Sequence, residues 1–141
     1  MDGDTQQRTG PLLGVRVLEL GNFIAGPFAG QLFGDYGAEV IKIEAPDGDP
    51  MRRWGVCVDD SSLWWPIISR NKRSVVADLK DPDDLAFVQR LAADCDVVLE
   101  NFRPGVLAKF GLDHATLSAT NPGVIVTHVS GFGQTGPRAT E

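Results

Sequence analysis

The chain has 141 residues, of which 43% are hydrophobic and 23% charged, proportions typical of one globular domain with a buried core. Its formal net charge is −6 and its isoelectric point is about 4.8, which argues against a general binder of nucleic acid or of anionic membranes. Residues 1–10 lack the apolar stretch of a secretory signal, and no apolar run approaches the ~20 residues of a membrane span. We therefore expect a cytoplasmic protein with a disordered tail at 1–10 and one domain at 11–141.

Short apolar runs alternate with helix-like segments along this domain. In chain order, the expected elements are a strand at 15–21, a helix at 26–38, strands at 39–44 and 74–79, a helix at 81–95, a strand at 96–102, a helix beginning within 104–111 and a strand at 123–131. Near-continuous apolar strands separated by helices are typical of a parallel sheet covered on both faces. The expected fold class is therefore α/β, a Rossmann-like three-layer domain with a mostly parallel sheet.

Segment 45–73 is too long for an ordinary connection between a strand and a helix, and it carries all three tryptophans. Connections of this length are usually functional or pack on another part of the protein. The simpler alternative is that Trp64 and Trp65 cover the edge of the sheet. Cys57 lies in this segment, far from Cys95, and neither belongs to a CxxC pair. We expect Cys95 to be a buried free thiol, and we expect no metal site.

Ligands of open parallel sheets bind outside the carboxyl ends of the strands. The exit of the strand at 96–102 brings an amide, an aromatic ring and a guanidinium (Asn101, Phe102 and Arg103) to the start of a helix. Lys109 follows on that helix, and Lys80 leaves the strand at 74–79. Several cations beside one aromatic ring suit a ligand with a purine and phosphates. The alternative is that Phe102 belongs to the core and the cations are solvated.

The sequence lacks three familiar nucleotide-binding and hydrolase motifs. The loop "GNFIAGPFAG" is neither a P-loop nor a GxGxxG fingerprint, because its glycines have the wrong spacing and no Lys-Ser/Thr follows. Glu44 nevertheless ends the second strand about 20 residues later, where a dinucleotide site places its ribose-binding acid, so a nicotinamide site stays open. "HVSGF" lacks the first glycine of GxSxG. His128 alternates with Val126 and is interpreted as a core histidine, whereas His114 is expected to be exposed.

Four segments occur together in order: "GPFAGQLFGDYGAEVIKIEAPDGDPMRRWG", "NKRSVVADLKDP", "VVLENFRPGVLAKFGL" and "NPGVIVTHVSGFGQTGP". Over residues 11–137 the chain thus resembles the opening portion of the family III CoA-transferases, which include formyl-CoA:oxalate and carnitine CoA-transferases and the α-methylacyl-CoA racemases. The resemblance implies an N-terminal, CoA-binding part of a larger domain, incomplete relative to the family fold. It also implies an acyl-CoA and a small carboxylic acid as substrates and an intertwined homodimer, with no nucleic acid, membrane or metal.

The resemblance also implies which positions contact coenzyme A, which is a substrate here. The implied positions, joined by Arg103 from the strand exit described above, are Phe23, Ile24, Ala77, Lys80, Asn101, Phe102, Arg103 and Lys109. Lys109 stands where relatives often have Arg, so a bidentate phosphate contact would be lost. Ala45 stands where relatives often have a basic residue, which weakens a second phosphate contact.

The chemistry that the resemblance implies is nucleophilic catalysis by a carboxylate. In the transferases an Asp attacks the acyl-CoA thioester and gives an anhydride and then an enzyme–CoA thioester; in the racemases a His and an Asp move the α-proton. These residues lie beyond "GQTGP", so we assign no catalytic residue, and Asp96, Asp113 and His128 match none of them. We expect a transferase fragment that is inactive alone. The alternatives are a racemase fragment and a non-catalytic nucleotide-binding module of the Rossmann type.

Overall fold

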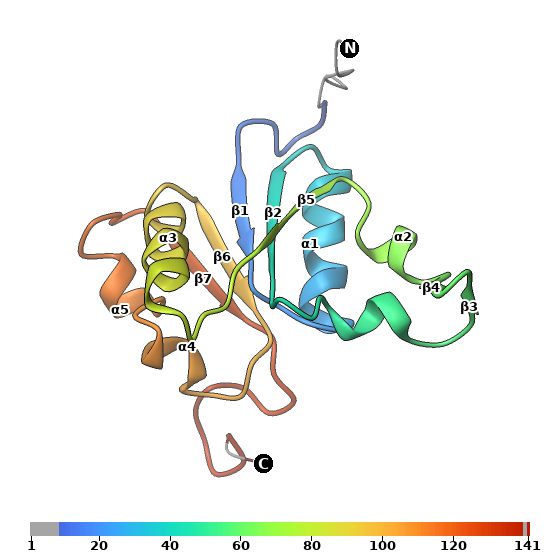
Figure 1. Cartoon of the computed structure of the whole chain (residues 1–141). Helices are drawn as coiled ribbons and strands as arrows, with labels where there is room; N and C mark the ends of the chain where they lie inside the picture. The colour runs from blue at the N-terminus through green and yellow to red at the C-terminus, as the bar shows by residue number, and fades with distance from the viewer. Residues whose placement is uncertain (1–8, 140) are drawn as a thin grey trace.

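The computed structural model describes residues 9–139 and 141, and its centre is a five-stranded sheet (Figure 1). The sheet order is β5-β2-β1-β6-β7, and every pairing in it is parallel. The strands are β1 (Arg16–Glu19), β2 (Glu39–Glu44), β5 (Lys72–Val76), β6 (Val97–Glu100) and β7 (Ile125–His128). This confirms the predicted α/β class with a mostly parallel sheet.

The strand order reverses once. From the central β1 the chain first adds β2 and β5 on one side and then returns to add β6 and β7 on the other. In open parallel sheets the connections that leave the two strands at such a reversal run to opposite faces of the sheet, and ligands bind in the crevice between them. The crevice expected from this topology lies between the exits of β1 and β6.

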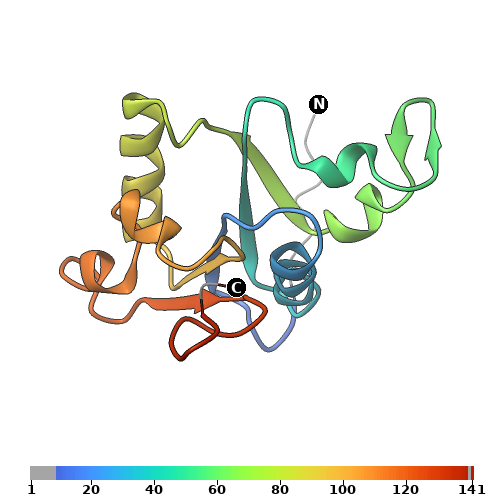
Figure 2. The ribbon, with the colours of Figure 1, turned by 90° about the horizontal axis from the view of Figure 1, so that it is seen from below.

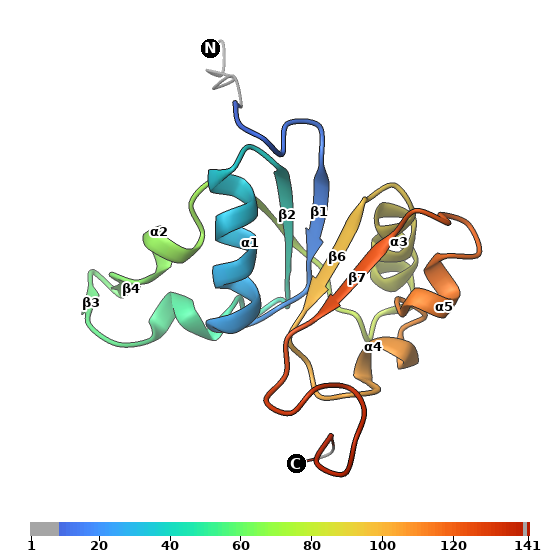
Figure 3. The same ribbon diagram turned by 180° about the vertical axis from the view of Figure 1, so that it is seen from behind.

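Helices cover both faces of the sheet, as the opposite views in Figures 1 and 3 show. Helix α1 (Ala25–Asp35) covers one face, and α3 (Pro82–Ala93), α4 (Val106–Lys109) and α5 (His114–Leu117) lie on the other. Alternate residues along each strand enter two separate cores because successive side chains point to opposite faces. In β1, Val17 packs in the smaller core under α1, and Leu18 packs in the larger core under α3.

The start of α3 follows the sequence prediction closely. The carboxylate of Asp81 accepts hydrogen bonds from the backbone N–H groups of Asp83 (2.9 Å) and Asp84 (3.1 Å), and Pro82 occupies the first helical position. The side chain of Asp84 then accepts the N–H of Asp78 at 2.8 Å. This cap therefore fixes both the helix and the loop that enters it from β5.

The long segment between β2 and β5 forms a small lobe of its own. It contains a 3-10 helix, η1 (Pro50–Arg53), a hairpin of β3 (Cys57–Val58) and β4 (Ser61–Ser62), and helix α2 (Trp65–Ile68). Figure 2 shows this lobe to one side of the sheet, away from α3. The ring of Trp64 lies 6.3 Å from that of Trp54, and Arg52 lies over the Trp65 ring at 3.9 Å. Both tryptophans thus pack on their own segment, not as a cover of the sheet edge.

Strand β7 (Ile125–His128) is shorter than the predicted 123–131, and β5 begins at Lys72 instead of 74 and ends at Val76 instead of 79. A charged residue opens this strand because its Nζ is neutralised inside the fold, which the pattern of apolar residues does not reveal. Residues 1–8 of the predicted tail lie outside the described residues, whereas Gly10 packs against the carbonyl of Tyr36. Among the helices that the structure describes, none is long and apolar enough to cross a membrane.

Candidate functional site

A cavity of about 260 Å3 opens at the carboxyl edge of the sheet, beside the reversal between β1 and β6. It is lined by Leu20, Asn22, Ile43, Ala45, Ala77, Asp78, Leu79, Lys80, Phe102, Val106 and Phe110. These residues come from the exits of β1, β2, β5 and β6 and from α4. We call this space the switch-point cavity. Its walls are mostly apolar, with a few polar groups, as is usual for sites that bind small organic molecules.

Three of the predicted CoA-contacting residues, Ala77, Lys80 and Phe102, meet in this cavity. Phe102 also packs against the larger core, so it serves as a core residue and as a cavity wall at once. Its backbone N–H donates to Oε2 of the buried Glu100 at 2.5 Å, which fixes the turn that leaves β6. The cavity can therefore offer an aromatic face held in a defined position.

Lys80 supplies a cation to the same cavity. Its backbone N–H donates to the carboxylate of Asp78 at 2.9 Å, in the loop that the α3 cap holds in place. In the described part of the chain its side chain has no hydrogen bond or ion pair. An ammonium group without a partner beside an aromatic face remains available to an anionic ligand.

Asn101 holds the two strand exits together. Its Oδ1 accepts the backbone N–H of Asn22 at 2.8 Å, and its Nδ2 donates to the carbonyl of Asn22 at 2.9 Å. A Cβ atom at Gly21 would lie 2.8 Å from this Oδ1, so only glycine fits beneath the amide. The structure thus gives Asn101 a role in fixing the crevice, and a ligand contact by its side chain stays a prediction.

Phe23 and Ile24 lie in the loop between β1 and α1, outside the lining of the switch-point cavity. Phe23 adopts a left-handed conformation (φ 68°), which is unusual for a bulky residue. Its N–H donates to the carboxylate of Asp49 at 3.1 Å, and its ring lies 5.4 Å from that of Trp54 in an edge-to-face arrangement. Ile24 is 45% exposed. Their contact with coenzyme A stays a prediction for a ligand that extends beyond the cavity.

A buried network of charges supports that loop from below. Lys42 Nζ lies 3.0 Å from Glu19 and 2.8 Å from Asp49, and it donates to the carbonyl of Gly21 at 2.7 Å. Lys72 Nζ completes the network at 2.7 Å from Glu19. Burial lowers the pKa of Lys72, which Glu19 opposes. The formal charges of the two lysines and the two carboxylates sum to zero, which limits the free-energy cost of burying them. Sequence analysis missed this network, whose only signal is the lysine inside the apolar run "EVIKIE".

Glu44, the candidate ribose-binding acid, is engaged within the protein. Its carboxylate accepts two hydrogen bonds from Arg52 (2.7 and 2.8 Å), one from Ser74 Oγ (2.5 Å) and one from the N–H of Asp49 (3.0 Å). Burial alone would raise its pKa, but these hydrogen bonds lower it to about 2. Since Glu44 is 2% exposed, it is not free to bind a ribose. The hypothesis of a nicotinamide site therefore lacks the ribose-binding carboxylate on which it rested.

Arg103 lies apart from the switch-point cavity, in a second pocket of about 270 Å3 between α4 and β7. We call it the α4–β7 pocket, and its lining is Glu100, Arg103, Gly105, Leu107, Ala108, Asp113, His128 and Gln134. His128 Nδ1 pairs with Glu100, and its side chain is 27% exposed. The interpretation of His128 as a core residue is therefore wrong, because it stands at the rim of a pocket. Lys109 is exposed on α4 and lines neither space.

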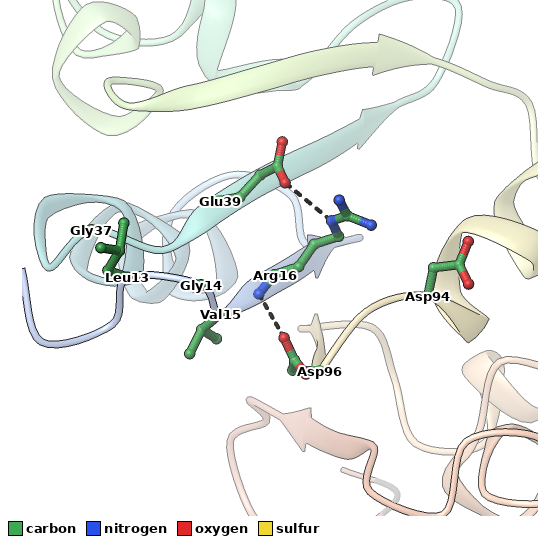
Figure 4. A pocket seen from close by; sticks show the side chains of 8 residues that line it. All are labelled: Leu13, Gly14, Val15, Arg16, Gly37, Glu39, Asp94 and Asp96. Carbon is green, nitrogen blue, oxygen red and sulfur yellow. Dashed lines mark hydrogen bonds and ion pairs between the residues drawn. The ribbon is translucent and has the colours of Figure 1, made fainter. Parts of the chain in front are cut away.

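A third cavity, about 440 Å3, lies at the opposite edge of the sheet (Figure 4). The guanidinium of Arg16 donates to Glu39 at 3.0 Å, and the backbone N–H of Arg16 donates to Asp96 at 2.8 Å. The charged residues Arg16, Glu39 and Asp96 of this cavity thus hold the amino ends of the strands together. Asp96 tethers β1 here, and Asp113 stands at the N-cap position of α5, where its carboxylate accepts a hydrogen bond from Thr116 Oγ1, so both side chains have structural partners.

The remaining candidates for chemistry are two thiols. Cys57 is exposed and free, and Cys95 is a buried free thiol, as predicted for Cys95. Burial raises the pKa of the Cys95 thiol to about 11. Residues 9–139 and 141 contain no group of three or more His, Cys, Asp or Glu side chains that could hold a metal ion.

Comparison with known proteins decides the family. The model of CoA-transferase family III matches residues 12–141, almost the whole chain. The chain belongs to CoA-transferase family III. This confirms the resemblance drawn from the four sequence segments.

Two family III relatives show what this chain is similar to. It is 56% identical to a succinyl-CoA–D-citramalate CoA-transferase of Chloroflexus aurantiacus over 135 residues, which are 94% of this chain and 34% of that protein. It is 46% identical to a succinate–glutarate CoA-transferase of Agrobacterium fabrum, covering 96% of this chain and 36% of that protein. The chain therefore spans about a third of the length of these family III relatives.

A solved family III structure has the same fold. The CAIB/BAIF family protein from Brucella suis superposes with a TM-score of 0.87 at 43% identity, over 94% of this chain and 36% of that one. The five-stranded sheet and its helices are thus the portion of the fold that this chain shares with a larger protein.

Proposed function

We propose that this chain supplies the nucleotide end of the coenzyme A site in a family III CoA-transferase. The observation that carries the proposal is the switch-point cavity, where Phe102 and Lys80 stand together at the reversal of strand order. An aromatic face suits the adenine ring, and an ammonium without a partner suits a phosphate. At about 260 Å3 the cavity is slightly below the ~300 Å3 at which pockets for drug-sized ligands begin, so it would hold only part of coenzyme A.

We propose that the complete protein transfers coenzyme A between an acyl-CoA and a small carboxylic acid. The relatives named above support this: one acts on succinyl-CoA and D-citramalate and the other on succinate and glutarate, and both are transferases. Transfer through an aspartyl anhydride and an enzyme–CoA thioester would need a carboxylate nucleophile. None of the described residues is assigned that role, so this chain would contribute binding and orientation. We further propose, from the resemblance alone, a cytoplasmic intertwined homodimer.

The proposal is tested by calorimetric titration of the chain with coenzyme A and, separately, with NAD⁺. We expect saturable heat with coenzyme A and none with NAD⁺, because Glu44 is already bound by Arg52. Saturation by NAD⁺ with no response to coenzyme A would overturn the proposal.

Three matched variants locate the site. Lys80→Ala should weaken coenzyme A binding by about tenfold, the usual effect of losing one charge-assisted contact. Arg90→Ala removes one positive charge from the exposed face of α3 and should leave binding unchanged. Lys109→Ala tests a second predicted cation, which lies outside the cavity lining. Equal losses in Lys80→Ala and Arg90→Ala would show only a general effect of net charge and would contradict this placement.

A further inference from the structure

We propose that the α4–β7 pocket is a second ligand site, which binds a carboxylate or phosphate group through Arg103, His128 and Gln134. The pocket is distinct from the switch-point cavity, although both use the segment that follows β6. Phe102 and Val106 face the switch-point cavity, whereas Arg103 and Leu107 face the α4–β7 pocket. The segment is thus a wall between two spaces, and the evidence for the second space is independent of the first.

The first observation is an amide donor that is buried without a partner. Nε2 of Gln134 is shielded from solvent and has no hydrogen-bond acceptor in the structure. Burying an amide without a hydrogen bond is unfavourable, and such a group calls for an explanation, one of which is a molecule or ion that binds there. Gln134 lines the α4–β7 pocket, so an acceptor atom inside that pocket would satisfy it.

The second observation is a cation that nothing in the described chain neutralises. The guanidinium of Arg103 has no hydrogen bond or ion pair among residues 9–139 and 141. Arg52 and Arg70, in contrast, are paired with Glu44 and Asp35. Guanidinium groups bind carboxylates and phosphates with two parallel hydrogen bonds. An unpaired Arg103 beside an unsatisfied amide donor therefore points to an oxyanion.

The third observation is the orientation of His128. Its Nδ1 contacts Oε1 of Glu100, a residue that is 2% exposed, and Oε2 of the same carboxylate accepts the N–H of Phe102. Both oxygens of Glu100 are thus engaged, and the ring of His128 is held by one nitrogen. No contact within the described residues engages its Nε2. This nitrogen is a third group available to a ligand.

The acidic residues of the pocket limit the affinity we expect. The negative charge of Glu100 faces His128 and the N–H of Phe102. Asp113 accepts a hydrogen bond from Thr116 Oγ1 at 2.6 Å, but its charge still lies on the pocket wall. It should repel an anion across the pocket. Asp113→Asn removes that charge and keeps a side chain that can accept the Thr116 hydrogen bond, so this variant should bind the anion more tightly.

The test is an NMR titration of the chain with inorganic phosphate, with succinate and with coenzyme A, followed at the Gln134 side-chain amide and the His128 ring. We expect saturable shifts at both with phosphate or succinate. Arg103→Ala should weaken the response by about tenfold, Asp113→Asn should strengthen it, and Arg90→Ala, the matched charge control, should change nothing. Backbone spectra of each variant show that the fold is kept.

The three probes distinguish the source of the oxyanion. A response to phosphate and coenzyme A but not succinate assigns the pocket to a phosphate of the coenzyme, and a response to succinate alone assigns it to the acid substrate. Either supports the proposal, and either can occur whether or not coenzyme A occupies the switch-point cavity. Absence of saturable shifts at Gln134 and His128 with all three probes would overturn it. Equal weakening in Arg103→Ala and Arg90→Ala would overturn it as well.

Discussion

Asn101 holds the main chain of Asn22 at both of its polar groups, accepting from the N–H at 2.8 Å and donating to the carbonyl at 2.9 Å. One amide side chain thereby joins the exits of β6 and β1, the two strands at which the sheet order reverses. Asn22 itself lines the switch-point cavity. The edge of that cavity is thus fixed by a single side chain, which can be tested by substitution.

Replacing Asn101 by Ala should lower the free energy of unfolding by about 2–3 kcal/mol, because two hydrogen bonds are lost and two main-chain groups of Asn22 lose their partners. Urea denaturation followed by circular dichroism measures the change. Asn22→Ala is the matched control: it keeps the tether, which uses only the main chain of Asn22, and should cost much less. Similar losses in both variants would contradict the tether.

The stability of the chain should fall in acid through Glu44. Its pKa is lowered from 4.5 to about 2 in the folded state, so the stabilisation is fully present above pH 4.5 and is lost as the pH falls from about 4.5 to about 2. This difference in pKa corresponds to about 3 kcal/mol. Urea midpoints measured across this range should drop less steeply for Glu44→Gln than for the native chain. Parallel slopes for the two proteins would refute the assignment.

The two thiols should differ sharply in reactivity. Cys57 is exposed, whereas Cys95 is 1% exposed and burial raises its pKa to about 11. Because the thiolate is the reactive form, iodoacetamide near pH 8 should label Cys57 rapidly and Cys95 only after denaturation. Peptide mass spectrometry reads the two sites separately. Prompt labelling of Cys95 in the folded chain would contradict the packing described beneath α3.

The chain should self-associate through its exposed apolar side chains. Phe28 and Leu32 stand on successive turns of α1 and Tyr36 follows its last residue; they are 50%, 41% and 55% exposed. Large apolar patches of this kind promote association. Sedimentation velocity should show a species whose size grows with concentration, and Phe28→Ser with Leu32→Ser should reduce it. Phe87→Ser on α3, where the ring is 40% exposed, serves as control. A stable monomer at every concentration would disprove this prediction.

The sequence predicted the sheet, its layers and part of the candidate site for one physical reason. Carboxyl ends of parallel strands meet at one edge, so Lys80 and Phe102, which follow different strands, were expected together and line one cavity. The partners of buried charges could not be predicted in this way. Glu44 is bound by Arg52 from the following loop, and Lys42 meets Asp49 of that loop. Such pairings depend on how an irregular segment folds back, which periodicity does not encode.

The same limit applies to the other predicted contacts with coenzyme A. Arg103 was grouped with Phe102 because they are adjacent in sequence, but consecutive residues after β6 face different spaces, and Arg103 lines the α4–β7 pocket. No sequence pattern marks Gln134 as a site residue, because only the fold shows that its amide is buried without a partner. The sequence thus pointed to the carboxyl edge of the sheet, and the structure shows two separate pockets there.

The central claim is that the switch-point cavity holds the adenine of coenzyme A against Phe102. The most direct measurement is an isotope-edited nuclear Overhauser experiment between the adenine protons of bound coenzyme A and the ring protons of Phe102 in the chain. We expect cross-peaks between them if Phe102 forms the wall against which the adenine lies. Saturable binding of coenzyme A with no cross-peak from adenine to Phe102 would contradict it.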